Sequence, residues 1–136
     1  MTITHHELCF GCGIANLFGL QMEVEPAAEG EVSGRFFLKQ DHQGPPGYAH
    51  GGVIACALDE AMALCVRSAI GEGATELTGR LEVDFRAPAP VGTFVRVAAR
   101  IDQRGPGALE LSASARGVGG ERPLIAEARA RFVAPR

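Results

Sequence analysis

The stretch that decides the fold spans residues 50–67 and reads HGGVIACALDEAMALCVR. Two glycines open a long apolar run, and Asp59 and Glu60 are the only charged residues between Gly52 and Val66. Apolar residues lie on every side of the predicted helix, which is typical of a helix buried all round. A carboxylate inside such a helix is costly unless it has a partner or a chemical role. We therefore expect this helix to be the core of the fold and to carry the functional site.

Length and composition predict one domain over residues 1–136, in which residues 1–19 form an N-terminal cap. The chain has 136 residues, of which 46% are hydrophobic and 21% charged, as in ordinary globular proteins. The net charge is −3 and no run of Lys or Arg occurs, which argues against nucleic acid or an anionic membrane as a partner. No signal-peptide pattern and no long uncharged apolar run is present, so a cytoplasmic location is expected.

A Cys-x-x-Cys pair at Cys9 and Cys12 lies in the cap. It is open to three interpretations: half of a metal site, a redox pair, or a structural turn. A zinc site needs four ligands, and only His5 and His6 lie nearby in the sequence. A redox pair needs a thioredoxin-like strand and helix around it, and neither is evident. A turn without metal is the favoured interpretation, and a metal shared across a dimer is the lesser one; no metal and no cofactor are expected.

Alternating apolar and polar residues predict strands on both sides of the helix. The predicted helix ends near residue 69, and the predicted strands cover 20–25, 32–38, 78–87, 93–102, 109–118 and 124–133. Short Gly- and Pro-rich turns join them, including a two-residue hairpin turn at Gly119-Gly120. Short turns imply antiparallel neighbours, so the fold class is α+β, with one helix on one face of an antiparallel sheet.

Small residues in the strands suggest how closely the helix packs. Four alanines are expected to face it: Ala98, Ala113, Ala115 and Ala128. An antiparallel sheet that covers one helix still leaves an edge strand unpaired. We therefore expect a homodimer in which the edge strands of two copies pair.

A helical wheel separates the two carboxylates of the central helix. Asp59 falls on a strip of small residues, with Gly52, Ala55, Cys56, Ala63 and Val66. It is either a catalytic carboxylate or a structural one that is hydrogen-bonded or faces solvent. Glu60 falls on another side, where a solvated charge or one facing Arg67 is expected.

The start of the helix supplies hydrogen-bond donors, because its first N–H groups have no partner and Gly51 has no side chain to block them. These donors lie about 10 Å from the Asp59 carboxylate along the axis, too far to act on one carbonyl. Two antiparallel helices in a dimer could bring them together. His50 is expected to fix the preceding loop, with a general-base role as the alternative. In that loop His42 and Asp41 are expected to be exposed, and Gln43 either lies on the surface or hydrogen-bonds the substrate or water.

His50-Gly51-Gly52 followed by Asp59, nine residues after the histidine, resembles the signature of hotdog-fold thioesterases of the phenylacetate-degradation (PaaI-like) type. The lead-in GPPGYA at 44–49 resembles the same superfamily. The opening Cys9-x-x-Cys12-Gly13…Asn16-x-x-Gly19-Leu20 is similar to many bacterial members. The resemblance covers nearly the whole chain and implies a long central helix wrapped by a five- to six-stranded antiparallel sheet.

The resemblance implies hydrolysis of an acyl-CoA thioester to free acid and CoA, with CoA present only as part of the substrate. In the family the N–H at the position of Gly51 holds the thioester oxygen. The acid at Asp59, from the partner subunit, acts as base or nucleophile. A hydroxyl at Thr78 assists the water, with Thr75 as the fallback, and Gln43 stands near where relatives carry an Asn or Gln.

Candidate substrate-binding residues are Gly52, Tyr48, Ala63 and Arg80. Phosphates of CoA would need surface cations, for which Arg80, Arg86, Lys39 and Arg104 are options. The expected assembly is a homodimer, extended to a dimer of dimers.

Two other functions remain open. One is a non-catalytic protein that binds acyl-CoA or a small ligand on the same fold. The other is an enoyl-CoA hydratase-like lyase.

Overall fold

The computed structural model describes residues 1–118 and 123–135. Its elements in chain order are β1 (Glu23–Ala28), β2 (Glu31–Phe37), the short 3₁₀ helix η1 (Gln40–His42), α1 (Gly51–Ile70), β3 (Leu77–Phe85), β4 (Phe94–Gly105), β5 (Ala108–Gly117) and β6 (Leu124–Val133). Neither helix of the described chain combines the length and the apolar character needed to cross a membrane. The turn predicted at Gly119-Gly120 lies outside the described residues.

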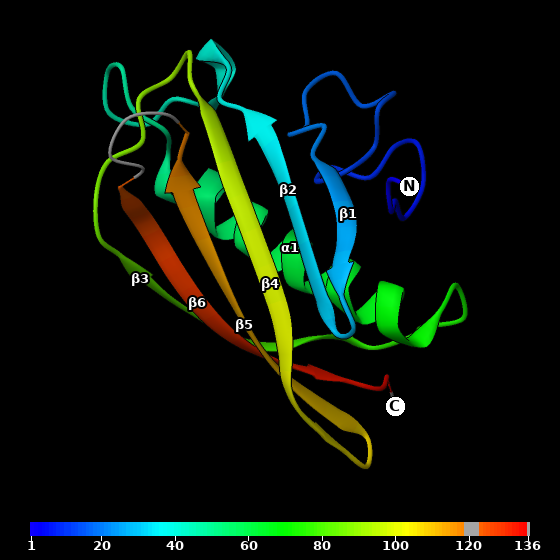
Figure 1. The fold of residues 1–136 in the computed structure, drawn as a ribbon. Coiled ribbons are helices and arrows are strands. Elements are labelled where there is room, and N and C mark those ends of the chain that lie inside the picture. The colour runs from blue at the N-terminus through cyan, green and yellow to red at the C-terminus, as the bar shows by residue number, and fades with distance from the viewer. Residues whose placement is uncertain (119–122, 136) are drawn as a thin grey trace.

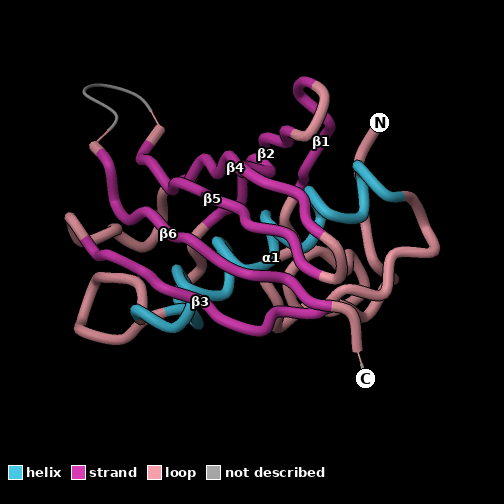
Figure 2. Tube along the Cα trace, turned by 90° about the horizontal axis from the view of Figure 1, so that it is seen from below, coloured by secondary structure: helices cyan, strands magenta, loops and turns pink. Residues whose placement is uncertain are grey.

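The strands form one six-stranded sheet in the order β1-β2-β4-β5-β6-β3, and every neighbouring pair is antiparallel. Figure 1 shows α1 behind the sheet, and Figure 2 shows the strands curving over one side of it. One helix against an antiparallel sheet confirms the predicted fold class. β1 and β3 stand at the two edges, and α1 separates them in the sequence.

Strand alternation decides which side chains meet the helix. In β4, Val95, Val97 and Ala99 are buried, whereas Arg96 and Ala98 are exposed on the outer face. The alanines of β5 and β6 that were expected under the helix are buried: Ala113, Ala115 and Ala128. The expectation for Ala98 was wrong by one position, because Ala98 pairs with Ser114 on the outer face and Ala99 takes the inner place.

Two residues fix the ends of α1. The His50 ring caps the start by accepting a hydrogen bond from the Gly52 N–H at 2.8 Å. Gly71 ends the helix at φ 111°, a backbone conformation that favours glycine, and its N–H donates to the Arg67 carbonyl at 2.8 Å. The predicted boundary near residue 69 is thus within one residue of the observed end.

The prediction that α1 is buried all round was wrong for one side. Leu58, Ala61 and Leu64 are fully buried in the core. The strip that carries Asp59 remains at least partly exposed; its members are Gly52, Ala55, Cys56, Asp59 and Ala63. The sheet wraps only part of the helix, so the strip of small residues forms an uncovered face in the single chain.

The first strand also begins later than predicted. β1 starts at Glu23 and continues through Pro26, which was expected to lie in the turn. Proline is tolerated there because β1 is an edge strand, where a missing N–H removes no ladder bond on the open side. Residues 20–22 belong instead to the cap, since Leu20 N–H donates to the Phe10 carbonyl and Met22 N–H to the Gly11 carbonyl.

An irregularity near Gly79 turns Thr78 toward the helix. Thr78 pairs with Phe132 and Leu81 with Ala130, and both of these partners are buried on the helix side. Thr78 and Leu81 are three residues apart, so regular alternation would put them on opposite faces. The bulge between Thr78 and Arg80 adds the residue that keeps both on the inner face and leaves Arg80 on the outer one.

Candidate active site

The Asp59 carboxylate is held by the Thr78 hydroxyl. Thr78 Oγ1 donates to Asp59 Oδ1 at 2.7 Å, from the start of β3 to the middle of α1. Asp59 is half-buried, and burial raises its pKa, an effect that the Thr78 hydrogen bond opposes. The predicted residues Asp59 and Thr78 are therefore brought together, although Thr78 reaches this place only because of the bulge that follows it.

The N-terminus of α1 presents a free donor. Gly51 is the first helical residue and is exposed, and its N–H has no acceptor among the described residues. The ring of Phe85 borders it, since a Cβ added to Gly51 would lie 3.6 Å from that ring. The His50 ring uses its Nδ1 to cap the helix, and it is the His50 N–H that bonds the preceding loop, at the His42 carbonyl.

A hollow of about 330 Å³ opens beside Gly51. Apolar residues from the helix start, the end of β3 and the following loop make up most of its wall: Ala49, Ile54, Phe85, Ala87, Pro88, Ala89 and Ile125. Arg86, one of the cations considered for CoA, also lines it. The hollow thus joins an apolar wall and a backbone donor, whereas the Arg86 guanidinium pairs with Glu127. Phe85 and Ile54 were missed from the sequence, where they are ordinary core-pattern residues.

Asp59 does not reach this hollow within one chain. Asp59 is eight positions after Gly51, which corresponds to about 12 Å along the helix axis. Each chain therefore carries two separate halves of the candidate site. One half is the donor and hollow at Gly51, and the other is the Asp59–Thr78 pair two turns further along.

The remaining predicted site residues fall into two groups. Gly52 and Ala63 lie on the partly exposed strip with Asp59. Gln43 is tied into its own loop, where its Nε2 donates to the Gln40 carbonyl at 3.0 Å and its Oε1 accepts from Gly47 N–H at 2.7 Å. Tyr48 is exposed and bridges to Pro90 across the loop.

Arg80 is not brought near Asp59 in the single chain. It lies on the outer face of β3, where its guanidinium pairs with Glu82 at 2.6 Å. Of the other cations considered for CoA, Lys39 donates to the Leu17 carbonyl and to Gln21 Oε1, both at 3.0 Å.

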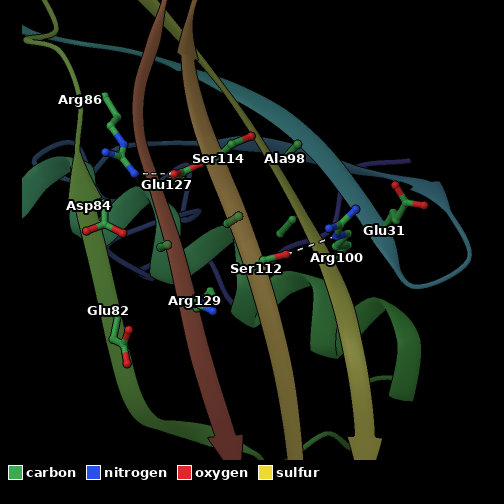
Figure 3. Close-up of a pocket in the computed structure, with 13 residues that line it drawn as sticks. Glu31, Glu82, Asp84, Arg86, Ala98, Arg100, Ser112, Ser114, Glu127 and Arg129 are labelled. Atoms are coloured by element: carbon green, nitrogen blue, oxygen red, sulfur yellow. Dashed lines mark hydrogen bonds and ion pairs between the residues drawn. The ribbon is translucent and has the colours of Figure 1, made fainter.

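Another hollow, of about 630 Å³, lies on the outer face of the sheet, away from α1. Figure 3 shows its mixed lining, with Glu82, Asp84 and Glu127 among the acids and Arg86 and Arg100 among the bases. Arg86 pairs with Glu127 at 2.8 Å, which compensates charge on both. This region contains neither the Asp59–Thr78 pair nor the Gly51 donor, so we place the candidate active site at the helix.

The expectation for Glu60 was wrong. The residue is only 9% exposed and its side chain hydrogen-bonds His5 Nδ1 at 2.9 Å, rather than facing solvent or Arg67. Burial acts to raise the pKa of Glu60, but hydrogen bonds from His5 and the cap cysteines outweigh it and lower the pKa. The same Glu60 hydrogen bond raises the pKa of His5 to about 9. The wheel placed Glu60 away from Asp59, but it could not show that the cap covers that side.

His42 is also buried, at 3% exposure, against the expectation that it is a loop surface residue. Its Nδ1 accepts from the Lys39 N–H at 3.1 Å, and its carbonyl accepts from the His50 N–H at 2.8 Å. Burial lowers the pKa of His42. This histidine therefore anchors the loop that leads into the helix, while Asp41 beside it is exposed as expected.

Comparisons with known proteins agree with this fold. Residues 46–107 match the family model of the thioesterase superfamily. The chain is 32% identical over 91 residues to acyl-coenzyme A thioesterase THEM4 of Bos taurus, and the match covers 67% of this chain and 35% of that protein. The chain spans roughly a quarter to a third of the length of the curated relatives it matches.

Solved structures share the fold at low sequence identity. The E. coli PaaI protein from the phenylacetic acid degradation operon superposes with a TM-score of 0.76 at 16% identity, covering 86% of this chain and 81% of that chain. A Streptococcus mutans protein solved with bound acetyl-CoA superposes with a TM-score of 0.73 at 16% identity, covering 84% and 88%. Residues 46–107 therefore match the thioesterase superfamily, and the described chain has the hotdog fold of these solved structures.

The cap at His50 generates a stability prediction. His50→Ala removes the acceptor for the Gly52 N–H and should lower the free energy of unfolding by about 0.5–2 kcal/mol, measured by urea denaturation. His50→Asn should keep most of the stability, because an asparagine oxygen can accept the same hydrogen bond. Equal losses in the two variants would show that the ring acts through packing and not as a cap.

Proposed function

We propose that this protein is an acyl-CoA thioesterase that hydrolyses an acyl-CoA to a free acid and CoA. The Gly51 N–H of one subunit binds the thioester oxygen, and Asp59 of a second subunit acts as general base or nucleophile. The observation that carries this proposal is the uncovered face of α1, which presents a free backbone donor at one end and a desolvated carboxylate two turns later. The name of the bovine relative and the acetyl-CoA in the Streptococcus structure support it.

The Gly51 donor suits an oxyanion. A hydrogen bond from a helix N-terminus stabilises the negative charge that develops on the thioester oxygen, and the helix dipole adds to it. Phe85 and its apolar neighbours border the exposed Gly51. The interaction therefore favours the tetrahedral transition state over the neutral thioester.

Asp59 suits activation of water, or direct attack. As a base it takes a proton from water while the water oxygen bonds to the carbonyl carbon. The C–S bond then breaks, the electron pair leaves with the CoA sulfur, and Asp59 returns the proton to that thiolate. Thr78 holds one carboxylate oxygen and orients the other toward the reacting atoms. If Asp59 attacks directly, its free oxygen bonds to the carbonyl carbon, the C–S bond breaks with the electron pair on sulfur, and water then hydrolyses the anhydride to the free acid and the Asp59 carboxylate, its proton passing to the thiolate.

The edge strand β3 explains how two copies complete the site. Thr78, near Asp59, stands at one end of β3, and Phe85, near Gly51, stands at the other. If two β3 edges pair antiparallel about a two-fold axis between Leu81 and Glu82, Thr78 of each copy lies opposite Phe85 of the other. Each Asp59 then approaches the Gly51 end of the second helix, and the exposed side chains of Leu77 and Phe85 become covered. A dimer of dimers would use further surfaces.

The acyl group would occupy the space along the uncovered strip, where Ala63 and Gly52 leave room between two helices. CoA would extend outward past the helix start, near Arg86 and Tyr48. No cofactor takes part, because water and the carboxylate supply the whole reaction.

The first test is turnover by Asp59→Asn. The variant should lose about 10²- to 10⁴-fold in kcat while acyl-CoA binding persists, because the amide keeps the shape and the Thr78 contact but cannot accept a proton. Thiol release and calorimetric binding measure the two quantities. Glu72→Gln changes an exposed carboxylate beyond the helix and is the matched control.

Unchanged kcat in Asp59→Asn contradicts the role of Asp59. Binding with no thiol release from any acyl-CoA supports a binding protein, and a hydroxyacyl-CoA product supports a lyase.

The Gly51 donor can be removed without disturbing the helix. Proline is favoured at the first helical position, and His50 already has the extended conformation that a residue before proline requires, at φ −64° and ψ 136°. Gly51→Pro should lower kcat by about 10²- to 10³-fold with little change in thermal stability. Gly51→Ala keeps the N–H and has room against Phe85, so it should retain most activity. Equal activity of the two variants rules out the Gly51 N–H as the donor.

Mixing the two defective variants tests whether the site is shared. In a hybrid dimer of Gly51→Pro and Asp59→Asn chains, one site has both intact groups and the other has neither. Random co-refolding should restore about a quarter of wild-type activity, because half of the dimers are hybrids and each has one good site. Sites formed within one chain would give no recovery, so an inactive mixture refutes the composite site.

A further inference from the structure

Four side chains with metal-binding atoms converge on one point between the cap and α1. They are His5, Cys9, Cys12 and Glu60, and their ligand atoms all lie within 4.8 Å of one another. The Cys9 sulfur lies 3.6 Å and the Cys12 sulfur 3.7 Å from His5 Nδ1, and the Cys9 sulfur lies 3.5 Å from Glu60 Oε2. This cluster lies on a different side of α1 from the Asp59 strip.

These separations are those of ligands around a tetrahedral ion. With bonds of about 2.3 Å to sulfur and about 2.0–2.1 Å to nitrogen or oxygen, tetrahedral Zn²⁺ holds sulfur about 3.5 Å from nitrogen or oxygen. The sulfur distances in the cluster match this value. The His5–Glu60 distance of 2.9 Å is shorter by only a few tenths of an ångström, because the two groups form a direct hydrogen bond.

The backbone of the cap is built closely around the cluster. Gly13 N–H donates to the Cys9 carbonyl at 2.8 Å, which closes the loop that carries both thiols. The His5 N–H donates to the Cys12 sulfur at 3.2 Å, the kind of outer-shell bond that steadies a metal-bound thiolate. A side chain at Gly11 would collide with the Glu60 side chain, so glycine there lets the carboxylate reach the cysteines.

We propose that His5, Cys9, Cys12 and Glu60 bind one Zn²⁺ per chain and that this ion fastens the N-terminal cap to the central helix. Two thiolates and an imidazole favour zinc over the hard cations Mg²⁺ and Ca²⁺, which prefer oxygen. The chain itself supplies all four positions, so the ion is structural and does not activate water. The proposal replaces the metal-free turn that the sequence favoured, because the sequence did not identify Glu60 as a fourth ligand. It does not depend on the proposed thioesterase activity.

The test begins with metal content and then uses Co²⁺ as a spectroscopic probe. Protein purified under reducing conditions should contain about one zinc per chain by elemental analysis, as a closed four-ligand site predicts. After chelation, one equivalent of Co²⁺ should give sulfur-to-metal charge transfer and the intense visible bands of a tetrahedral site. His5→Asn, Cys12→Ser and Glu60→Gln should each weaken Co²⁺ binding at least about tenfold, since even outer-shell changes cost about 10- to 100-fold.

Matched controls separate the cluster from general damage. His6→Asn alters the exposed neighbouring histidine, and Cys65→Ser alters a buried thiol that bonds the Gly30 carbonyl elsewhere in the fold. Both should keep the wild-type spectrum and stoichiometry. If Cys12→Ser fails to fold, His5→Asn changes a partly exposed cap residue and still decides the question. A reduced, folded protein that takes up no Zn²⁺ or Co²⁺ overturns the proposal, as does an unchanged cobalt spectrum in His5→Asn or Glu60→Gln.

Discussion

The structure depends on the desolvation of one helix by a sheet that covers it incompletely. Residues such as Leu58, Ala61 and Leu64 lose all contact with water against the curved inner face of the strands. Burial of apolar area on this scale is the main favourable contribution to folding. Because the sheet ends at β3, one strip of α1 stays open, and this strip carries the only half-buried carboxylate of the helix.

Two consecutive carboxylates illustrate what this incomplete cover does. Asp59 and Glu60 differ by about 100° around the helix, so they meet different surroundings. Asp59 faces the open strip and is held by a single hydroxyl from β3. Glu60 faces the cap, where an imidazole and two thiols surround it. Two neighbouring carboxylates thus meet an open strip in one direction and the N-terminal cap in the other.

The local pattern of apolar and polar residues was sufficient to predict most of the fold. The alternation of apolar residues placed the strands, and the glycines at 51–52 and 71 placed the ends of the helix. The errors have local physical causes. Proline continued β1 because that strand is at an edge, and Ala98 lies outside because the inner register of β4 falls on Ala99. His42 is buried because the loop folds back on it.

The sequence by itself determined the element order, the helix N-terminus at Gly51, and the separation of Asp59 from Glu60 around the axis. These follow from periodicity and backbone sterics, which act over a few residues. Only the tertiary structure decided that a bulge turns Thr78 onto Asp59, and that Glu60 meets His5 and two cysteines more than forty-five residues earlier. Such contacts depend on strand register and on how the cap packs against α1, which no short-range pattern encodes.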